Sequence, residues 1–245
     1  MKPIISVIIP AYNEEEILGR SLKSLRDQKT KVSYEIIVCD NNSTDRTMNI
    51  ARRYADKVIS EKRQGISHTR NRGVKESDGE YLVHTDADTL FPSNFIEEVY
   101  KLFEKGIYAG FMCGSWNYYD GNSIKVKILA RLQGIFFYVA CRILELRNVL
   151  QIPGWCLCTP RKIFEKVGGF HDSDLLEDVY YSYAIEPYGK KAFFPKIRVR
   201  SSVRRLEHGV ASLTKHYTYR GNGLWKFFKN MFRASHYCPG KTCNS

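Results

Sequence analysis

The chain has 245 residues, of which 43% are hydrophobic and 26% are charged, and its net charge is +12. This balance excludes an intrinsically disordered chain and is sufficient for one sizeable hydrophobic core. The charge is uneven, because residues 196–245 contain eleven Lys and Arg and one acidic residue, net +10, which leaves +2 for residues 1–195. A basic C-terminal quarter predicts an anionic partner, such as phosphate, nucleic acid or an acidic lipid surface.

The start of the chain contains an apolar run of at most five residues. That is too short for the core of a secretory signal peptide, so a cytoplasmic location is expected. In that compartment the seven cysteines are expected to be buried thiols. The alternative is a structural zinc ion, for which the C-x-C spacing is poor, held by Cys156, Cys158, Cys238 and Cys243.

A strand and a helix are predicted at the start of the chain. Residues Ile4–Ile9 form a β-branched run, as expected for a strand that is buried on both faces. Asn13 is expected to cap the following helix, with the acidic residues Glu14–Glu16 in its first turn. An apolar stripe at helical spacing is predicted to face the sheet, at Ile17, Leu18, Leu22 and Leu25.

Further strands alternate with helices up to about residue 90. Strands are predicted at Tyr34–Cys39, Lys57–Ser60 and Tyr81–Thr85. Helices are predicted near Arg46–Tyr54 and Ser67–Ser77. Strands separated by helices of about a dozen residues indicate an α/β fold, with a parallel sheet and right-handed crossovers.

Polar residues follow three of these strands, at Tyr12-Asn13, at Asp40-Asn41-Asn42, and at Asp86 and Asp88. Because the carboxyl ends of parallel strands lie side by side, these residues are expected to form one crevice. Two carboxylates one residue apart suit Mg²⁺ or Mn²⁺, and such an ion bridges the oxygens of a diphosphate. An Asp-x-Asp motif alone also occurs in solvated turns. The chain has no Walker-type glycine loop and no Gly-x-Gly-x-x-Gly after its first strand, so a metal ion on the Asp pair is predicted to hold the nucleotide.

Several segments carry a resemblance to a known enzyme family, in order and spacing from about residue 4 to 222. They are Ser6–Glu15, Asp40–Thr47, Gly65–Gly73, Asp86–Asp88, Gly168–Phe170 with Glu177-Asp178, and His208–Ser212 with Tyr219-Arg220. In these segments the chain resembles the family 2 glycosyltransferases, which are inverting enzymes with the GT-A nucleotide-sugar fold. The resemblance implies a Rossmann-like, mostly parallel sheet flanked by helices.

The resemblance also implies a role for each matching residue. The nucleotide would be bound by Pro10, Ala11, Tyr12, Glu14, Asp40, Asn42, Arg70, Asp86, Ala87 and Asp88. Tyr12 would stack on the base, and Asp40 would accept a hydrogen bond from it. Asp88 would bind the divalent metal, and Asp86 would reach the ribose or the water shell of the metal. His208 would complete the metal site, or it is an ordinary surface histidine.

The resemblance places the catalytic base at Asp178, with Glu177 as the second candidate. An inverting transfer is an in-line displacement, in which a carboxylate takes the proton of the acceptor hydroxyl. Acids are also favoured in the first turn of a helix without any catalytic role. Many family members continue Glu-Asp-x-Asp, whereas Tyr180 stands at the last of these positions here, which weakens inferences about the acceptor. An acceptor such as polyprenyl phosphate is already ionised and would need no base.

The resemblance divides the chain into a GT-A domain over residues 1–222 and a basic amphipathic tail over residues 223–245. Within the domain, residues 1–112 would form the nucleotide-sugar half and residues 113–222 the acceptor half. The Gln-x-x-Arg-Trp signature of processive synthases is absent from the sequence. The transfer of a single sugar is therefore predicted.

Two amphipathic segments predict contact with a membrane surface. In Lys125–Leu150 the longest stretch without a charge is ten residues, too short to span a bilayer. This segment is either a core helix over the sheet or an interfacial helix with basic flanks. In Leu224–Arg233, aromatic side chains lie opposite lysines, which suits an anionic leaflet or a helix packed on its own domain. Peripheral attachment to the cytoplasmic face of a membrane is the preferred interpretation.

The expected function is that of a metal-dependent hexosyltransferase with a UDP- or GDP-linked sugar as donor and a lipid-linked or surface glycan as acceptor. One alternative is a polyprenyl-phosphate glycosyl synthase, and another is a non-catalytic nucleotide-sugar-binding protein. Nucleic-acid binding rests on charge alone, and no recognition motif supports it, so no nucleic-acid partner is expected.

Overall fold

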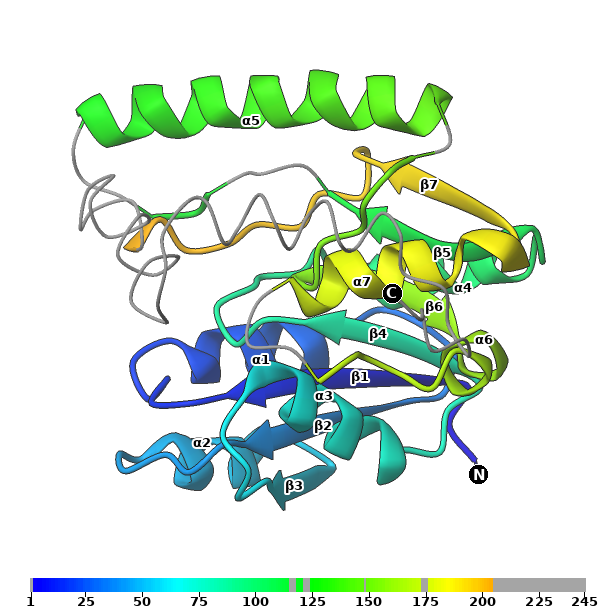
Figure 1. Cartoon of the computed structure of the whole chain (residues 1–245). Helices are drawn as coiled ribbons and strands as arrows, with labels where there is room; N and C mark the ends of the chain where they lie inside the picture. Colours follow the sequence, from blue (N-terminus) through cyan, green and yellow to red (C-terminus); the bar gives the residue numbers. More distant parts are fainter. Residues whose placement is uncertain (1, 115–117, 121–123, 148, 173–175, 205–245) are drawn as a thin grey trace, which may run out of the picture.

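The computed structural model describes residues 2–114, 118–120, 124–147, 149–172 and 176–204. These residues contain one seven-stranded sheet with the strand order β3-β2-β1-β4-β6-β5-β7 (Figure 1). Its strands are β1 (Ile5–Ala11), β2 (Tyr34–Asp40), β3 (Lys57–Ser60), β4 (Tyr81–Thr85), β5 (Tyr108–Cys113), β6 (Cys156–Pro160) and β7 (Lys190–Phe194). Strand β6 is antiparallel to β4 and β5, and the other pairs are parallel. The prediction of a mostly parallel α/β sheet is therefore confirmed.

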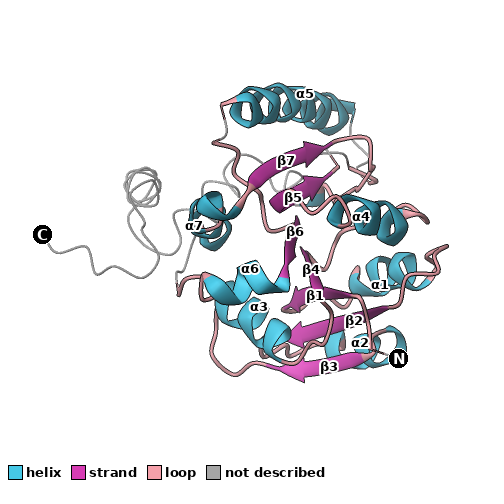
Figure 2. Cartoon of the chain, turned by 90° about the vertical axis from the view of Figure 1, so that its right-hand side faces the viewer, coloured by secondary structure: helices cyan, strands magenta, loops and turns pink. Residues whose placement is uncertain are grey.

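Helices cover both faces of this sheet. They are α1 (Leu18–Arg26), α2 (Thr47–Tyr54), α3 (Ile66–Lys75), α4 (Phe95–Phe103), α5 (Ile124–Leu146), α6 (Arg161–Lys166) and α7 (Glu177–Ala184), with a 3-10 turn η1 (Glu186–Tyr188). Figure 2 shows α1, α2 and α4 on one face and α3, α6 and α7 on the other, while α5 lies beyond the outer strand β7.

The centre of the sheet is the hydrophobic core. Ile5, Ile8 and Ile9 of β1 are fully buried. Helix α3 lies close against this strand at Gly73, where an added Cβ would be 2.6 Å from Ile8 Cγ2. This close approach brings Arg70, one turn earlier on α3, to the carboxyl edge of the sheet.

The start of the first helix differs from the prediction. Helix α1 begins at Leu18 rather than after Asn13, and it has no acidic residue in its first turn. The physical reason is that the chain after β1 is bonded to the loop after β2. The N–H of Glu14 donates to Thr47 Oγ1 at 2.8 Å, and the N–H of Glu15 donates to Asp45 Oδ2 at 3.1 Å. These bonds hold residues 14–17 in turns, and Asn13 takes a left-handed conformation with φ of 53°.

The predicted helix at residues 125–150 is α5, which ends four residues earlier than expected. Among the described residues, no helix is both long enough and apolar enough to cross a membrane. Five of the cysteines, at positions 39, 113, 141, 156 and 158, are buried free thiols, as predicted. Residues 224–233, as well as Cys238 and Cys243 of the alternative zinc site, lie outside the described residues.

Candidate functional site

The predicted site residues gather where β1, β2 and β4 end. The parallel register pairs Ala11 at the end of β1 with Asp40 at the end of β2. The loops after these two strands are tied together, because the N–H of Asn13 donates to Ser43 Oγ at 3.0 Å and the N–H of Thr44 donates to Asn13 Oδ1 at 2.8 Å. The polar ends of β1 and β2 thus lie side by side at one edge of the sheet, as expected for neighbouring parallel strands.

Asp40 carries a buried acceptor atom at this edge. Asp40 is 2% exposed, and its Oδ2 accepts a hydrogen bond from the N–H of Ser43 at 3.1 Å. Within the described part of the chain, Asp40 Oδ1 is buried and has no hydrogen-bond partner. A buried carboxylate oxygen without a donor is costly, so this position suits a ligand that brings an N–H group.

Other predicted nucleotide contacts differ in accessibility. Tyr12 is 52% exposed, so its ring is free to stack on a base, whereas Ala11 and Ala87 are buried. Asn42 is in a left-handed conformation, and its amide donates to the carbonyl of Lys62 at 2.9 Å. The side chain of Asn42 therefore positions the neighbouring loop after β3.

Asp86 and Asp88, which follow β4, point to two different arginines. Asp86 Oδ1 lies 2.9 Å from Nη2 of Arg70. Asp88 Oδ2 lies 3.7 Å from Nη2 of Arg204, which also forms an ion pair with the carboxylate of Glu14. Arg204 therefore links the loop after β1 to the loop after β4, although no motif in the sequence marks it as a site residue. His208 lies outside the described residues.

Arg70 is buried at the centre of the site and joins its two halves. It is 1% exposed, and its Nη1 lies 2.5 Å from Oε1 of Glu177 while its Nη2 bonds to Asp86. Gly154 leaves room for the guanidinium, since a Cβ there would lie 2.0 Å from Arg70 Nη1. The carbon centre of the guanidinium lies 5.6 Å from the centroid of the Phe170 ring. In this arrangement Arg70 holds the carboxylate of Asp86, which follows β4, close to the carboxylate of Glu177 on α7.

The candidate base Asp178 and its neighbour Glu177 occupy the first turn of α7. Asp178 Oδ2 accepts a hydrogen bond from the N–H of Gly154 at 2.8 Å, and its Oδ1 accepts one from the N–H of Val179 at 2.8 Å. Burial raises the pKa of Asp178. Burial and the adjacent charge of Asp178 raise the pKa of Glu177 to about 7. A carboxyl group with a raised pKa is a better proton acceptor near neutral pH, which is a property required of a general base.

The raised pKa of Glu177 predicts a pH dependence of stability. The folded protein binds this proton more tightly than the unfolded chain between the usual pKa of 4.5 and about 7. The resulting stabilisation is complete below the lower value and is lost as the pH rises to the upper one. We expect the free energy of unfolding of the wild type, relative to Glu177→Gln, to fall over this range by an amount on the order of 2 kcal/mol. Urea unfolding at a series of pH values measures this difference. The prediction would be contradicted if the free energies of unfolding of the two proteins changed in parallel with pH.

The residues at the end of β4 fit a divalent metal ion. Asp86 and Asp88 offer carboxylate oxygens, which are the donors that Mg²⁺ and Mn²⁺ prefer. Asp88 is buried to 7% exposure beside the cationic Arg204, so this position already attracts positive charge to its carboxylate. The described residues contain one further cluster of metal-ligating atoms, in which the thiols of Cys113, Cys156 and Cys158 lie within 4.8 Å of one another in the core.

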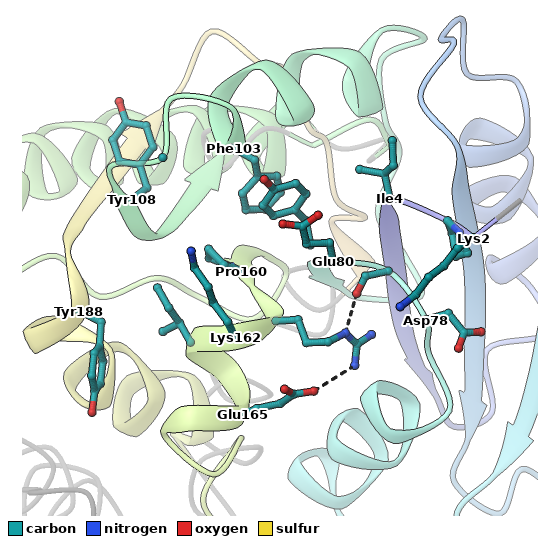
Figure 3. A pocket seen from close by; sticks show the side chains of 16 residues that line it. Lys2, Ile4, Asp78, Glu80, Phe103, Tyr108, Pro160, Lys162, Glu165 and Tyr188 are labelled. Carbon is teal, nitrogen blue, oxygen red and sulfur yellow. Dashed lines mark hydrogen bonds and ion pairs between the residues drawn. The ribbon is translucent and has the colours of Figure 1, made fainter.

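A pocket of about 620 Å³ lies at the opposite edge of the sheet, near the start of β1 and β4 (Figure 3). Its wall includes Lys2, Asp78, Glu80, Lys162 and Glu165. Among the described residues, none of those predicted to bind the nucleotide or the metal lines this pocket. The candidate site therefore lies among the polar residues at the carboxyl edge, where β1, β2 and β4 end.

Similar solved structures have the same fold. A mannosyltransferase from Pyrobaculum calidifontis, PcManGT in complex with GDP-Man and Mn²⁺, superposes with a TM-score of 0.67 at 22% identity, covering 97% of this chain and 70% of that one. TarS from S. aureus in complex with UDP-GlcNAc has a TM-score of 0.63 at 19% identity, covering 82% of this chain and 58% of that one. Both likenesses establish the GT-A fold for this chain.

Sequence comparison adds named relatives. A "Probable glycosyltransferase YdaM" of Bacillus subtilis is 28% identical over 206 residues, which are 79% of this chain and 49% of that protein. A "UDP-Glc:alpha-D-GlcNAc-diphosphoundecaprenol beta-1,3-glucosyltransferase WfgD" of Escherichia coli is 29% identical over 132 residues, or 52% of this chain and 51% of that protein. The chain thus spans about half the length of these two relatives. The family described as "Glycosyl transferase family 2" matches residues 6–168, more than half of the chain, and the chain therefore belongs to glycosyl transferase family 2.

Proposed function

We propose that this protein is a metal-dependent inverting glycosyltransferase that moves a single sugar from a nucleoside-diphosphate sugar to a lipid-linked or surface-glycan acceptor. The observation that carries the proposal is the buried Arg70, which bridges Asp86 on the donor side and Glu177 beside the candidate base. This bridge supports a site in which the donor diphosphate and the acceptor hydroxyl meet. Donor binding is assigned to residues 1–112 and acceptor binding to residues 113–222.

The donor base is proposed to bind between Tyr12 and Asp40. The exposed ring of Tyr12 offers a stacking surface, and the buried Oδ1 of Asp40 offers an acceptor for a base N–H. Uracil and guanine both carry a ring N–H next to a carbonyl. The two structural relatives bind GDP-Man and UDP-GlcNAc, so UDP- and GDP-linked donors are both candidates here.

The diphosphate is proposed to lie at Asp86 and Asp88. These carboxylates would hold Mg²⁺ or Mn²⁺, which supplies positive charge against the departing diphosphate. The guanidinium of Arg204, 3.7 Å from Asp88 Oδ2, adds a second cation at the same place. His208 is a further candidate metal ligand.

Asp178 is proposed to take the proton of the acceptor hydroxyl as that oxygen attacks the sugar carbon opposite the diphosphate. The hydrogen bonds from Gly154 and Val179 fix the orientation of its carboxylate, and Glu177, paired with Arg70, is the second candidate. A phosphate acceptor is the alternative. A "Dolichol-phosphate mannosyltransferase" of Pyrococcus furiosus is 36% identical over 107 residues, 42% of this chain and 30% of that protein. Such an acceptor is ionised and needs no base.

A lipid-linked acceptor places the reaction at a membrane surface. The net charge of +10 over residues 196–245 supports peripheral attachment to an anionic membrane, and we assign the protein to the cytoplasmic face. A non-catalytic nucleotide-sugar-binding protein is the second candidate function, because Tyr180 departs from the family pattern.

Binding of the donor is expected to raise the melting temperature only in the presence of metal. At a concentration of 100 times its Kd, one nucleotide sugar should raise Tm by about 5–10 °C with Mn²⁺ or Mg²⁺. A thermal-shift panel of UDP- and GDP-linked sugars, each with metal and with EDTA, measures this and identifies the base and the sugar. The absence of a shift with every donor, in a protein that unfolds cooperatively, would contradict the proposed function.

A further inference from the structure

Helix α5 has an apolar face that the other described residues do not cover. Six of its apolar side chains recur at helical spacing along one side and are 48–76% exposed, and Phe136 is the most exposed of them. We call them the α5 ridge: Ile128, Leu132, Ile135, Phe136, Val139 and Ile143. The line continues to Ile124 and to Leu146, which is 88% exposed. With these two residues the apolar line runs along the whole helix of 23 residues, which is about 34 Å long. A continuous apolar surface of this extent marks an interaction site.

The ridge is not the side of α5 that packs on the fold. That side carries Phe137, whose ring centroid lies 6.3 Å from that of Trp155 and 6.2 Å from that of Phe193. It also carries the buried Ala130 and Cys141. Helix α5 is therefore apolar on two opposite sides, and only its inner side packs against the hydrophobic core. The outer side requires a partner of its own.

Basic residues lie on one flank of the ridge and near its C-terminal end. Lys127 and Arg131 are exposed on its flank. At the C-terminal end of α5, a groove of about 950 Å³ between α4 and β7 is lined by Lys105, Lys190 and Lys196, which form no ion pair within the described residues. The apolar ridge thus ends beside a cluster of free positive charge.

We propose that the α5 ridge docks on an anionic lipid bilayer. The apolar side chains would enter the boundary between headgroups and acyl chains, and the lysines of the groove would face the phosphate groups. This combination of a long apolar face and basic flanks is that of an interfacial helix. Like the proposed function, this docking assumes an acceptor that is carried by a membrane.

Charge disfavours two other occupants of the ridge. A second copy of this chain would bring another net charge of +12 against basic flanks. The segment 205–245 of the same chain contains seven Lys and Arg against one acidic residue, so it would also bring positive charge to a basic surface. Anionic lipid is the partner with complementary charge.

Docking through the ridge would bring the site to the membrane. Near the start of α5, Ala130 packs on Val203, which directly precedes Arg204 at the donor site. Further along, Phe137 packs on Trp155, which directly follows Gly154, the hydrogen-bond donor to Asp178. Both halves of the site therefore rest against the inner side of the helix whose outer side would contact lipid.

Vesicle flotation tests the proposal with the full chain. The double variant Leu132→Glu, Phe136→Glu should bind vesicles of phosphatidylcholine and phosphatidylglycerol at least tenfold more weakly than the wild type, because two large apolar contacts are lost and two negative charges are added. The matched control is Arg53→Glu, which changes the net charge by the same amount at an exposed residue of α2, at the opposite end of the sheet from α5, and should bind as the wild type does. The wild type should also bind vesicles of pure phosphatidylcholine more weakly than vesicles that contain phosphatidylglycerol.

Three outcomes would overturn the proposal. Equal vesicle binding by the wild type and the double variant would exclude the ridge as the lipid surface. A dimeric wild type with a monomeric double variant, measured by light scattering, would assign the ridge to a second copy. A lower Tm of the double variant than of Arg53→Glu without lipid would show that the chain itself covers the ridge. Nucleotide-induced thermal shifts without lipid report on the proposed function separately.

Discussion

Asparagine at position 178 is expected to lower kcat for transfer to a hydroxyl acceptor by about 10²–10⁴-fold, the range that a positioned general base contributes. Asp178→Asn keeps the size of the side chain and can still accept a hydrogen bond from the N–H of Gly154. It cannot take a proton at neutral pH. Its donor affinity should therefore remain close to that of the wild type, and steady-state kinetics with separate titration of the donor measures both quantities.

A matched control for this variant is Asp27→Asn, which changes the exposed end of α1 and should leave kcat unchanged. Full activity of Asp178→Asn toward a hydroxyl acceptor would contradict the assignment of the base. Full activity toward a polyprenyl phosphate alone would instead identify the phosphate-acceptor reaction, in which no proton has to be removed.

The second large effect is expected at Arg70. Removing a buried charge that pairs with two carboxylates leaves those carboxylates without compensation, which costs about 3–5 kcal/mol. Arg70→Met should therefore lower the free energy of unfolding by about this amount at pH 8. The loss should be smaller at about pH 5, because Glu177, whose pKa is already raised, becomes neutral there by taking up a proton. Urea unfolding at the two pH values measures the difference.

Arg72→Met is the control for Arg70→Met, since Arg72 forms an ion pair with Glu76 on the partly exposed side of the same helix. It should cost no more than about 0.5 kcal/mol, as measured for pairs one helical turn apart. Equal losses in the two variants would show that the buried pairs of Arg70 do not stabilise the fold.

Local patterns were sufficient to predict much of the fold. The bounds of β3 and β4 agree with the prediction to the residue, because each strand is a short run bounded by turn residues. The acidic residues after β1 misled the prediction of α1. They look like the first turn of a helix, but the loop after β2, some 30 residues away in the sequence, holds them in turns.

The candidate site could be predicted only in part, because some of its contacts follow from local patterns and others join residues far apart in the sequence. The strand ends at Asp40, Asp86 and Asp88 follow from the alternation of strands and helices. The partners of Arg70 do not, because Glu177 lies 107 residues away and only the packing of α3 and α7 brings the two together. Arg204 is 190 residues from Glu14, and no local pattern distinguishes it from its basic neighbours.

The most direct test of the central claim is the metal dependence of nucleotide binding, measured as Kd by calorimetric titration of UDP and GDP. One nucleotide should bind the wild type with Mn²⁺ and at least tenfold more weakly with EDTA, and Asp88→Ala should lose this dependence on metal. Asp40→Asn should weaken binding about 10–100-fold, as expected for the loss of a hydrogen bond to a charged group. Equal affinity in metal and in EDTA, unchanged in both variants, would contradict a nucleotide-sugar site at the ends of β2 and β4.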